Sequence, residues 1–321
     1  MGTRLSNGIY RTNIFESPLV PVPDSRPYRS GAPSLPWGVR EIKAPSAWPI
    51  STGSGVRIAV IDTGLDYRHP DLRRAAAGGI NLVNPGRAPW DDNGHGTHIA
   101  GTIVASGDGK GIHGIAPDAE LYTVKAFDRN GTAYVSDIVH GIEWCIRNKM
   151  HIINMSFGMK TAPRSLQEAI RAAYQNGIVV VASSGNEGRI GDVDYPARYR
   201  HAIAVGATTR GGRLAPFSNR GRSIDLYAPG DKIASTWVGG GYREMSGTSM
   251  ATSHVSGVIA LLLSARPGLS PNAVRRLLQA SATPVTRGSL RLKAGQANAL
   301  LGLKLAGSLE ATTKTDSVGR R

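Results

Sequence analysis

The residues of this 321-residue chain whose chemistry stands out lie in three short strings: Asp62-Thr63-Gly64, His95-Gly96-Thr97-His98 and Gly247-Thr248-Ser249-Met250-Ala251. A serine hydroxyl is a weak nucleophile at neutral pH. It needs an imidazole to take its proton and a carboxylate to orient that imidazole. The chain offers one candidate for each role, among glycine and threonine residues that allow tight turns. The strings therefore predict nucleophilic catalysis by Ser249, with His95 as the base and Asp62 as the orienting carboxylate.

The order of these strings, together with further motifs, resembles the subtilisin family of serine proteases from about Pro36 to about Leu300. The further motifs are Ile42-Lys43-Ala44-Pro45, His69-Pro70-Asp71-Leu72, Gly141-Ile142-Glu143-Trp144, Ile153-Asn154-Met155-Ser156, Ser184-Gly185-Asn186-Glu187-Gly188 and Tyr227-Ala228-Pro229-Gly230. The resemblance implies a serine endopeptidase that hydrolyses peptide bonds through an acyl-enzyme intermediate.

The catalytic residues have competing interpretations. Ser249 can instead be only the N-cap of the apolar helix that follows, and His98 competes with His95 as the base. The resemblance assigns catalysis to the first histidine and packs His98 within the helix. It also implies that Asn186, after an apolar strand, stabilises the oxyanion together with the backbone N–H of Ser249. An ordinary turn asparagine is the alternative for this position.

The resemblance further implies that substrates bind as an extended strand along two backbone segments. The residues that match these segments are Gly131, Thr132, Ala133, Ser156, Phe157 and Gly158. Because backbone pairing holds a peptide whatever its side chains, we expect broad specificity. Taken alone, each segment is an ordinary loop.

One departure from the family concerns the pocket for the P1 side chain, the residue before the scissile bond. Asp194 stands where the family has a small residue before Tyr-Pro. A carboxylate at the floor of that pocket would favour lysine or arginine at P1, and Glu187 at the rim would add to the same field. The alternative is that Asp194 turns to solvent or pairs with Arg198, which leaves a broad apolar pocket.

A structural calcium site is also implied, formed by Asp71 and the glycine-rich loop 106–112. Calcium takes six to eight oxygen ligands, and such a loop can turn its carbonyl groups inward. The predicted ligands are side-chain oxygens of Asp71 and Asp108 and backbone oxygens of Ser106, Lys110 and Ile112. The alternative is a flexible loop between a helix and a strand.

These residues need a scaffold to position them, and short apolar runs that alternate with helical patterns predict one. The pattern indicates an α/β fold with a doubly wound, mostly parallel sheet and helices on both faces. Residues 178–182 are a continuous apolar run, as in a strand covered on both faces. Sites in such sheets lie at the carboxyl ends of strands, where Asp62 and Asn186 fall. We predict a subtilisin-like peptidase domain over residues 33–305.

Two terminal segments flank this predicted domain. Residues 1–32 are polar and rich in proline, which disfavours helix and predicts an extended arm. Within them, Leu19–Pro23 resembles the short inhibitory extension of the intracellular subtilisins, and a disordered tail is the alternative. Residues 306–321 are polar and charged, so we expect a disordered tail there.

The composition narrows the class of protein. The net charge of +15 would suit nucleic-acid binding, but the basic residues are spread along the chain, so we expect protein or peptide substrates and no specific nucleic acid. No stretch approaches the ~18 apolar residues of a membrane span. The single cysteine, Cys145, and a first segment without an apolar core predict a cytoplasmic protein. Secretion with the leader absent from this chain is the alternative, and a homodimer stays open.

Two other classes of function remain as alternatives to the peptidase. One is an inactive subtilisin-like protein that binds peptides without cleaving them, and the other is a basic nucleic-acid-binding protein. The first is disfavoured because the candidate residues Asp62, His95, Asn186 and Ser249 are all present.

Overall fold

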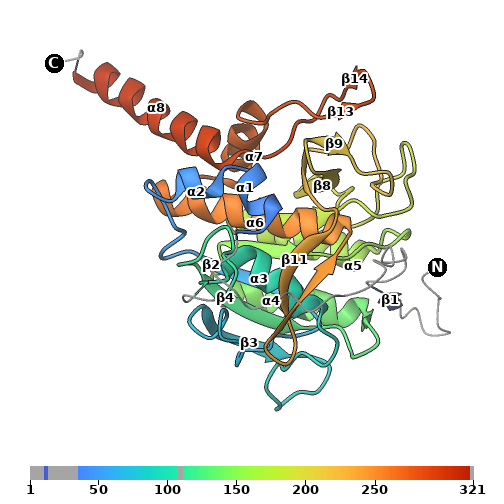
Figure 1. The fold of residues 1–321 in the computed structure, drawn as a ribbon. Helices are drawn as coiled ribbons and strands as arrows, with labels where there is room; N and C mark the ends of the chain where they lie inside the picture. The colour runs from blue at the N-terminus through green and yellow to red at the C-terminus, as the bar shows by residue number, and fades with distance from the viewer. Residues whose placement is uncertain (1–10, 14–34, 108–110, 319–321) are drawn as a thin grey trace.

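The computed structural model describes residues 11–13, 35–107 and 111–318 of the chain. Its centre is a sheet of parallel strands that ends in short antiparallel pairings (Figure 1). In spatial order the parallel strands are β3 (Ala76–Asn81), β4 (Glu120–Lys125), β2 (Arg57–Asp62), β6 (Ile152–Met155), β7 (Val179–Ser183) and β8 (Ala202–Thr209), with β10 (Leu226–Pro229) beside β8. Beyond β8 lie β9 (Arg213–Leu214), β13 (Thr286–Arg287) and β14 (Leu290–Arg291).

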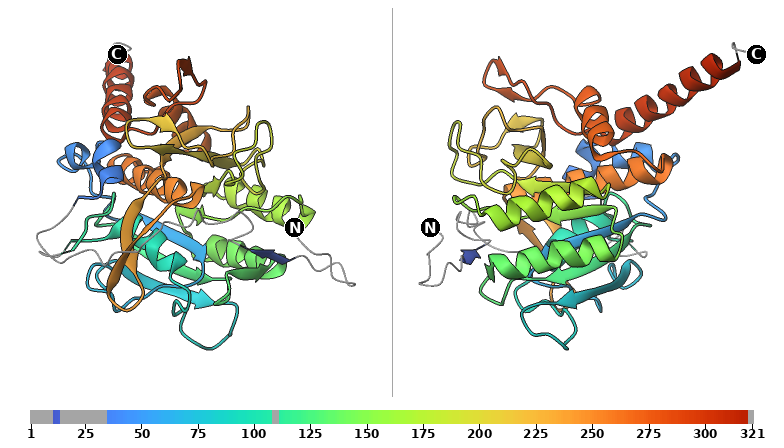
Figure 2. Two further views of the ribbon diagram at one scale, coloured as in Figure 1. Left: turned by 45° about the vertical axis from the view of Figure 1, so that its right-hand side comes forward. Right: turned by 180° about the vertical axis from the view of Figure 1, so that it is seen from behind.

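Helices cover both faces of this sheet (Figure 2), because alternate side chains of the strands face two separate cores. On β2, Ile58 and Val60 belong to one core, whereas Ala59 and Ile61 belong to the other. The first core is packed against α3 (His95–Val104) and α6 (Thr248–Ala265), and the second against α4 (Val135–Arg147) and α5 (Arg164–Gln175). The predicted α/β fold with a mostly parallel sheet is confirmed.

The remaining elements lie around this framework. Strand β1 (Arg11–Asn13) pairs with β5 (Thr132–Tyr134), and β11 (Ile233–Trp237) pairs with β12 (Gly241–Met245) in a hairpin. The short helices are α1 (Trp37–Glu41), α2 (Ala44–Ala47) and α7 (Pro271–Ala280), and the last element is α8 (Ala299–Val318).

Helix α6 is the central helix of the first core. Every residue from Thr248 to Leu262 is buried, so the helix is covered all round. Among the described residues it is also the one helix with the length and apolar composition of a membrane span, and 83% of that stretch is buried inside the protein. Its burial rigidly fixes its first turn, which carries Ser249.

The carboxyl end differs from the sequence expectation of a disordered tail over 306–321. Instead, α8 begins at Ala299 and continues to Val318, and Figure 1 shows its far end projecting from the body. Leu303 and Ala306 are buried, so the first turns of the helix pack on the core. The segment from Ala299 contains leucine and alanine and lacks proline, and once its first turns are anchored the helix propagates.

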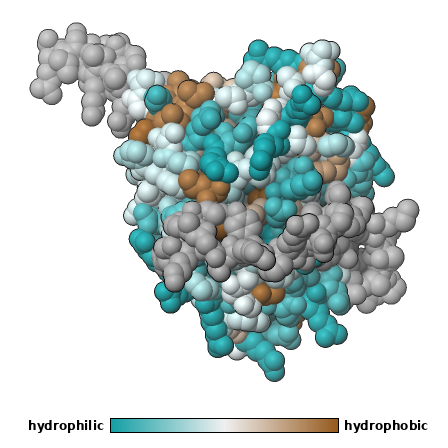
Figure 3. All heavy atoms as spheres, viewed as in Figure 1, coloured by the Kyte–Doolittle hydropathy of each residue, from teal (hydrophilic) through white to brown (hydrophobic). Residues whose placement is uncertain are grey.

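The surface is polar over most of the face shown in Figure 3, with small and separate hydrophobic areas. The exposed large hydrophobic side chains of the described residues lie far apart in the sequence: Ile50, Trp90, Ile190, Leu290 and Leu301. Isolated apolar residues of this kind are ordinary on soluble surfaces.

Candidate active site

Four of the predicted site residues lie at the carboxyl edge of the sheet or at helix starts beside it. Asp62 is the last residue of β2, and Asn186 follows β7. His95 is the first residue of α3, and Ser249 is the second residue of α6. Helices α3 and α6 pack against each other, so this edge gathers residues that are far apart in the sequence.

Asp62 and His95 form a buried pair. His95 Nδ1 lies 2.8 Å from Asp62 Oδ1 and 2.9 Å from Asp62 Oδ2, and both side chains are at most 1% exposed. The backbone N–H of Thr63 donates to Asp62 Oδ1 at 2.7 Å. The carboxylate therefore holds the proton on Nδ1, and Nε2 is left as the basic nitrogen of the neutral ring.

A close approach of two backbone segments keeps this pair together. A Cβ on Gly96, in the first turn of α3, would lie 2.2 Å from the carbonyl oxygen of Gly64, in the loop after β2. Only glycine permits that approach. The glycine that follows the histidine in the sequence string is therefore a packing requirement.

Asp91 joins the same two segments through hydrogen bonds, and the sequence analysis missed it. Its carboxylate, 1% exposed, accepts from Thr63 Oγ1 at 2.9 Å and from the backbone N–H groups of Asn93, Gly94 and Thr97 at 2.8–3.0 Å. The Thr63 hydroxyl in turn accepts from the N–H of Gly96 at 2.9 Å. An anion at the amino end of α3 also favours the helix dipole.

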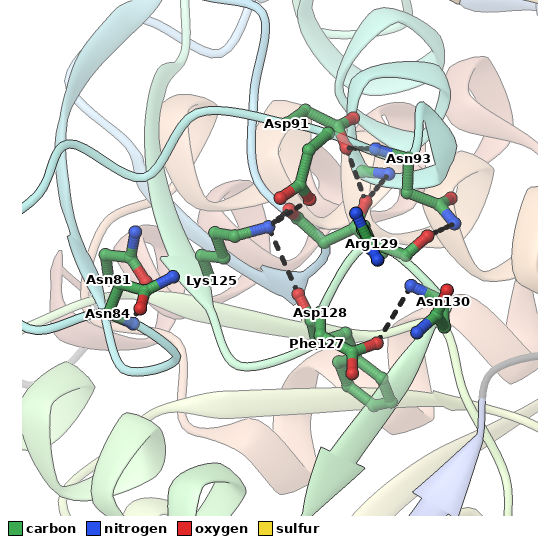
Figure 4. Close-up of polar contacts among 12 residues, drawn as sticks. Asn81, Asn84, Asp91, Asn93, Lys125, Phe127, Asp128, Arg129 and Asn130 are labelled. Carbon is green, nitrogen blue, oxygen red and sulfur yellow. Dashed lines mark hydrogen bonds and ion pairs between the residues drawn. The ribbon is translucent and has the colours of Figure 1, made fainter.

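Lys125 connects these segments to the turn before β5 (Figure 4). Its ammonium group, on a side chain that is 2% exposed, donates to the carbonyls of Thr63 and Phe127 and lies 2.6 Å from Asp92 Oδ1. Asn93 Nδ2 donates to the carbonyl of Arg129 at 3.0 Å. The loops that hold Asp62 and His95 are thereby tied to the predicted substrate strand.

Ser249 and Asn186 meet at the start of α6. The Ser249 hydroxyl donates to the carbonyl of Ser156 at 2.8 Å, and Asn186 Oδ1 accepts from both Thr248 N and Thr248 Oγ1 at 2.8 Å. A Cβ on Gly247 would lie 3.4 Å from Asn186 Nδ2, so the amide donor faces the first turn of the helix. The backbone N–H of Ser249 in that turn and the Asn186 amide are suited to an anion.

His98, the competing base, lies against the β11–β12 hairpin. Its Nε2 is 3.0 Å from the Ile233 carbonyl and 3.1 Å from the Arg243 carbonyl, so Nε2 carries the proton. Burial, assisted by nearby His95, lowers the pKa of His98 to about 3. The ring is thus a neutral packing group whose hydrogen bonds hold the hairpin on α3.

The predicted substrate segments fall on a short, partly buried strand and on a loop. Thr132 and Ala133 belong to β5, with Gly131 just before it, and 156–158 follow β6. A cavity of about 180 Å³ lies beside β5 and is lined by Asp128, Ala133 and Asp137, among others. Strand β1 of the amino-terminal extension pairs antiparallel with β5, with Arg11 opposite Tyr134 and Asn13 opposite Thr132.

The Asp194 side chain neither turns to solvent nor pairs with the Arg198 side chain. Its side chain is 4% exposed and forms an ion pair with Lys160, while the guanidinium of Arg198 lies over the ring of Tyr195. Lys160 also contacts Glu187 Oε2 at 2.8 Å. Burial raises the pKa of Asp194 to about 6, against the opposing effect of the Lys160 ammonium.

The predicted calcium ligands are only partly described, because Asp108 and Lys110 lie outside the described residues. The structure brings Asp71, Ser106 and Ile112 together: Asp71 Oδ2 accepts from Ile112 N at 2.9 Å, and the Asp71 carbonyl accepts from Ser106 N at 3.0 Å. Tyr242 also donates to Asp71 Oδ2. Within the described part of the chain, no three His, Cys, Asp or Glu side chains gather as a metal site.

Comparisons with known proteins identify the family of this chain. Residues 53–301 match the model of the subtilase family, Peptidase_S8, and the chain therefore belongs to that family. It is 45% identical over 253 residues to M-protease of Shouchella clausii, and the match covers 78% of this chain and 66%, just under two thirds, of M-protease. Subtilisin Savinase of Lederbergia lenta is 44% identical, with 93% of its length covered, and subtilisin E of Bacillus subtilis is 46% identical, with 67% covered.

We predict that Asp91→Asn lowers kcat for peptide hydrolysis at least about tenfold, because one hydrogen bond to a charged acceptor contributes roughly 1.5–3 kcal/mol. The substitution keeps the size of the side chain but removes the charge that holds Thr63 and the start of α3. Steady-state kinetics and thermal melting measure the effect. The matched control is Asp118→Asn, at a partly exposed surface pair with Arg74. An unchanged kcat for Asp91→Asn would contradict the positioning role.

Proposed function

We propose that the protein is a serine endopeptidase that hydrolyses peptide bonds in proteins and peptides. The observation that carries this proposal is the buried contact between Asp62 and His95 at the start of α3, a helix that packs against α6, whose first turn bears Ser249. Membership of the subtilase family supports the same activity, and the relatives are named subtilisins and alkaline proteases.

The proposed reaction begins when the Ser249 hydroxyl leaves the Ser156 carbonyl and attacks the substrate carbonyl carbon. His95 Nε2 accepts the hydroxyl proton, and the Asp62 carboxylate stabilises the imidazolium that forms. The tetrahedral oxyanion is held by the Asn186 amide and the Ser249 backbone N–H, next to the positive end of α6. His95 then donates its proton to the leaving amine. A water molecule hydrolyses the acyl-enzyme with His95 again as the base.

We predict that a serine-directed fluorophosphonate labels one residue and stops peptide hydrolysis in parallel. Ser249→Ala removes the labelling and lowers kcat by several orders of magnitude, because the nucleophile is gone. Ser264→Ala, at the exposed far end of the same helix, is the control and behaves as the wild type. If the protein binds peptides but takes up no fluorophosphonate, it is an inactive subtilisin-like binding protein.

We propose that substrates pair as an extended strand with Gly131–Ala133 and with the segment 156–158. The P1 side chain would then lie between Gly158 and Gly185, next to Asp194 and Glu187. Broad specificity follows from backbone pairing. A preference for basic P1 residues, which Asp194 predicts from the sequence, depends on the charge of Lys160, which already contacts both carboxylates.

The amino-terminal extension is proposed to inhibit the enzyme. Leu19–Pro23, the segment expected to cross the cleft, lies outside the described residues. The support comes instead from Arg11–Asn13, which pair antiparallel with Thr132–Tyr134. Two of these partners, Thr132 and Ala133, belong to the proposed substrate strand. One backbone edge cannot pair with the extension and with a substrate at the same time.

We predict that deletion of residues 1–32 raises the initial rate of hydrolysis of a short peptide substrate, because the edge of β5 becomes accessible. Initial rates per fluorophosphonate-titrated site are compared between the truncated and the full-length protein. A synthetic peptide of residues 1–32 should inhibit the truncated enzyme when added separately. Equal initial rates, with the full-length chain still intact by mass spectrometry, would rule out inhibition.

Structural calcium is a further proposal. The loop 106–112 and Asp71 would hold the ion through Asp71 and Asp108 side chains and backbone oxygens of Ser106, Lys110 and Ile112. Because Asp71 is 2% exposed and its Oδ1 lies against Gly111, a carboxylate is already fixed beside the loop. A bound calcium ion neutralises that charge and stabilises the folded loop.

We predict that chelation lowers the melting temperature, because a ligand at a hundredfold excess over its Kd stabilises the native state by about 2.7 kcal/mol. Melting is recorded with calcium and with EGTA. Asp108→Ala should remove the difference between the two conditions, and Asp128→Ala, in the turn before β5, should keep it. A wild-type melting temperature that ignores the chelator would show that the loop holds no calcium.

A cytoplasmic location is proposed on the single cysteine, with secretion as the alternative. Cys145 is fully buried on α4, and burial raises the pKa of its thiol, so it is an unreactive packing residue. A chain with one buried thiol folds without disulfides, as cytoplasmic proteins do.

A further inference from the structure

Lys160 places a positive charge between the carboxylates of Asp194 and Glu187. Its Nζ contacts Asp194 Oδ1 and lies 2.8 Å from Glu187 Oε2. The side chains of Asp194 and Glu187 are 4% and 16% exposed, whereas that of Lys160 is 31% exposed. Glu187 also accepts from Asn219 Nδ2, so both acids are held in place.

The position of this cluster follows from two backbone segments that start at the reacting groups. One runs from Ser156, which accepts from the Ser249 hydroxyl, and the other contains Asn186, which contacts Thr248. The Asp194 carboxylate lies between them. A Cβ on Gly158 would be 2.8 Å from Asp194 Oδ2, and one on Gly185 would be 2.5 Å from it.

A substrate acylating Ser249 must place its carbonyl near Asn186 and the Ser249 N–H. The side chain on the acyl side then extends between the same two segments, toward Asp194. The cluster therefore lies where the P1 side chain ends. This step rests on the proposed function.

The charges of the cluster are unequal. Two carboxylates contact one ammonium, and the Asp194 side chain is almost completely buried. Other charged groups also act on the two acids. Arg189, which contacts Asp192 at 2.9 Å, attracts Glu187 and Asp194, and Asp192 repels Asp194. The guanidinium of Arg198 lies over the ring of Tyr195. Hydrogen bonds and charge from the two acids raise the pKa of Lys160, against the desolvation that lowers it, so its ammonium stays charged to high pH.

We propose that Lys160 determines the charge selectivity at P1 by acting as an internal counter-cation for Asp194 and Glu187. With Lys160 in place, a P1 arginine or lysine gains little binding energy, because the two carboxylates that would bind it already contact the Lys160 ammonium. Uncharged P1 side chains are favoured. Without Lys160, the two acids are left for the substrate, and the same site selects basic P1 residues.

The test compares kcat/KM for matched peptides with arginine or phenylalanine at P1, at pH 9, which is well above the pKa of Asp194. Lys160→Met should raise the ratio of arginine to phenylalanine about 10- to 100-fold, the range of a charge-assisted hydrogen bond. Lys160→Arg keeps the cation and should keep the wild-type ratio. Lys160→Met combined with Asp194→Asn should lose most of the gain.

Asp194→Asn alone gives a second measurement that does not remove the cation. It leaves one acid for one ammonium, so the arginine-to-phenylalanine ratio should fall severalfold below the wild type. Fluorophosphonate titration of every variant gives the active fraction. A protein that takes up no label contradicts the peptidase function itself, which separates the two proposals.

Two results with the Lys160 variants would overturn the role of Lys160. One is a Lys160→Met ratio within twofold of the wild type in an enzyme that titrates normally. The other is an equal rise in Lys160→Arg, which would show that packing, and not charge, sets the ratio. A ratio that stays unchanged in Asp194→Asn counts against the proposal in the same way.

Discussion

The contact between Asp62 and His95 is the interaction on which the rest of the site depends. A carboxylate and an imidazole that are almost completely buried need a fixed geometry, because an unpaired buried charge is costly. The parallel sheet places Asp62 at a strand end, and the Gly96–Gly64 approach brings α3 within reach. Asp91 then bonds both segments, so that no part of the pair relies on a flexible loop.

The sequence alone predicted the site residues that lie next to a strong local pattern. Asp62 ends a continuous apolar strand, Asn186 follows another, and Ser249 opens an apolar helix, so the fold class and these positions could be predicted. Lys125 and Lys160 could not, because their carboxylate partners are distant in the sequence, and Asp91 could not, because its bond to Thr63 joins residues 28 positions apart. Lys160 and Asp194 are 34 positions apart, and Lys125 and the Thr63 carbonyl are 62 apart. An acid shortly before a helix start was the one local signal for Asp91.

Two competing requirements apply to the edge of β5. A strand that recognises peptides through its backbone must leave N–H and C=O groups unpaired, and such an edge also attracts segments of its own chain. Here Arg11–Asn13 add to that edge in the antiparallel direction. The residues of β1 are themselves polar and do not predict a strand, so the strand is defined by its partner and not by its own composition.

Lys125, which is buried, and Lys160, which is partly exposed, show that local charge balance, and not the net charge of +15, governs this region. Lys125 donates to two backbone carbonyls and a half-exposed acid, so its charge is satisfied within the scaffold and no substrate group can replace it. Within the described part of the chain, the Lys160 ammonium contacts two carboxylates and no other group, and the side chain is about one third exposed, so a substrate cation could compete for the same partners. The difference in partners therefore separates a lysine that supports the catalytic loops from one that can set specificity.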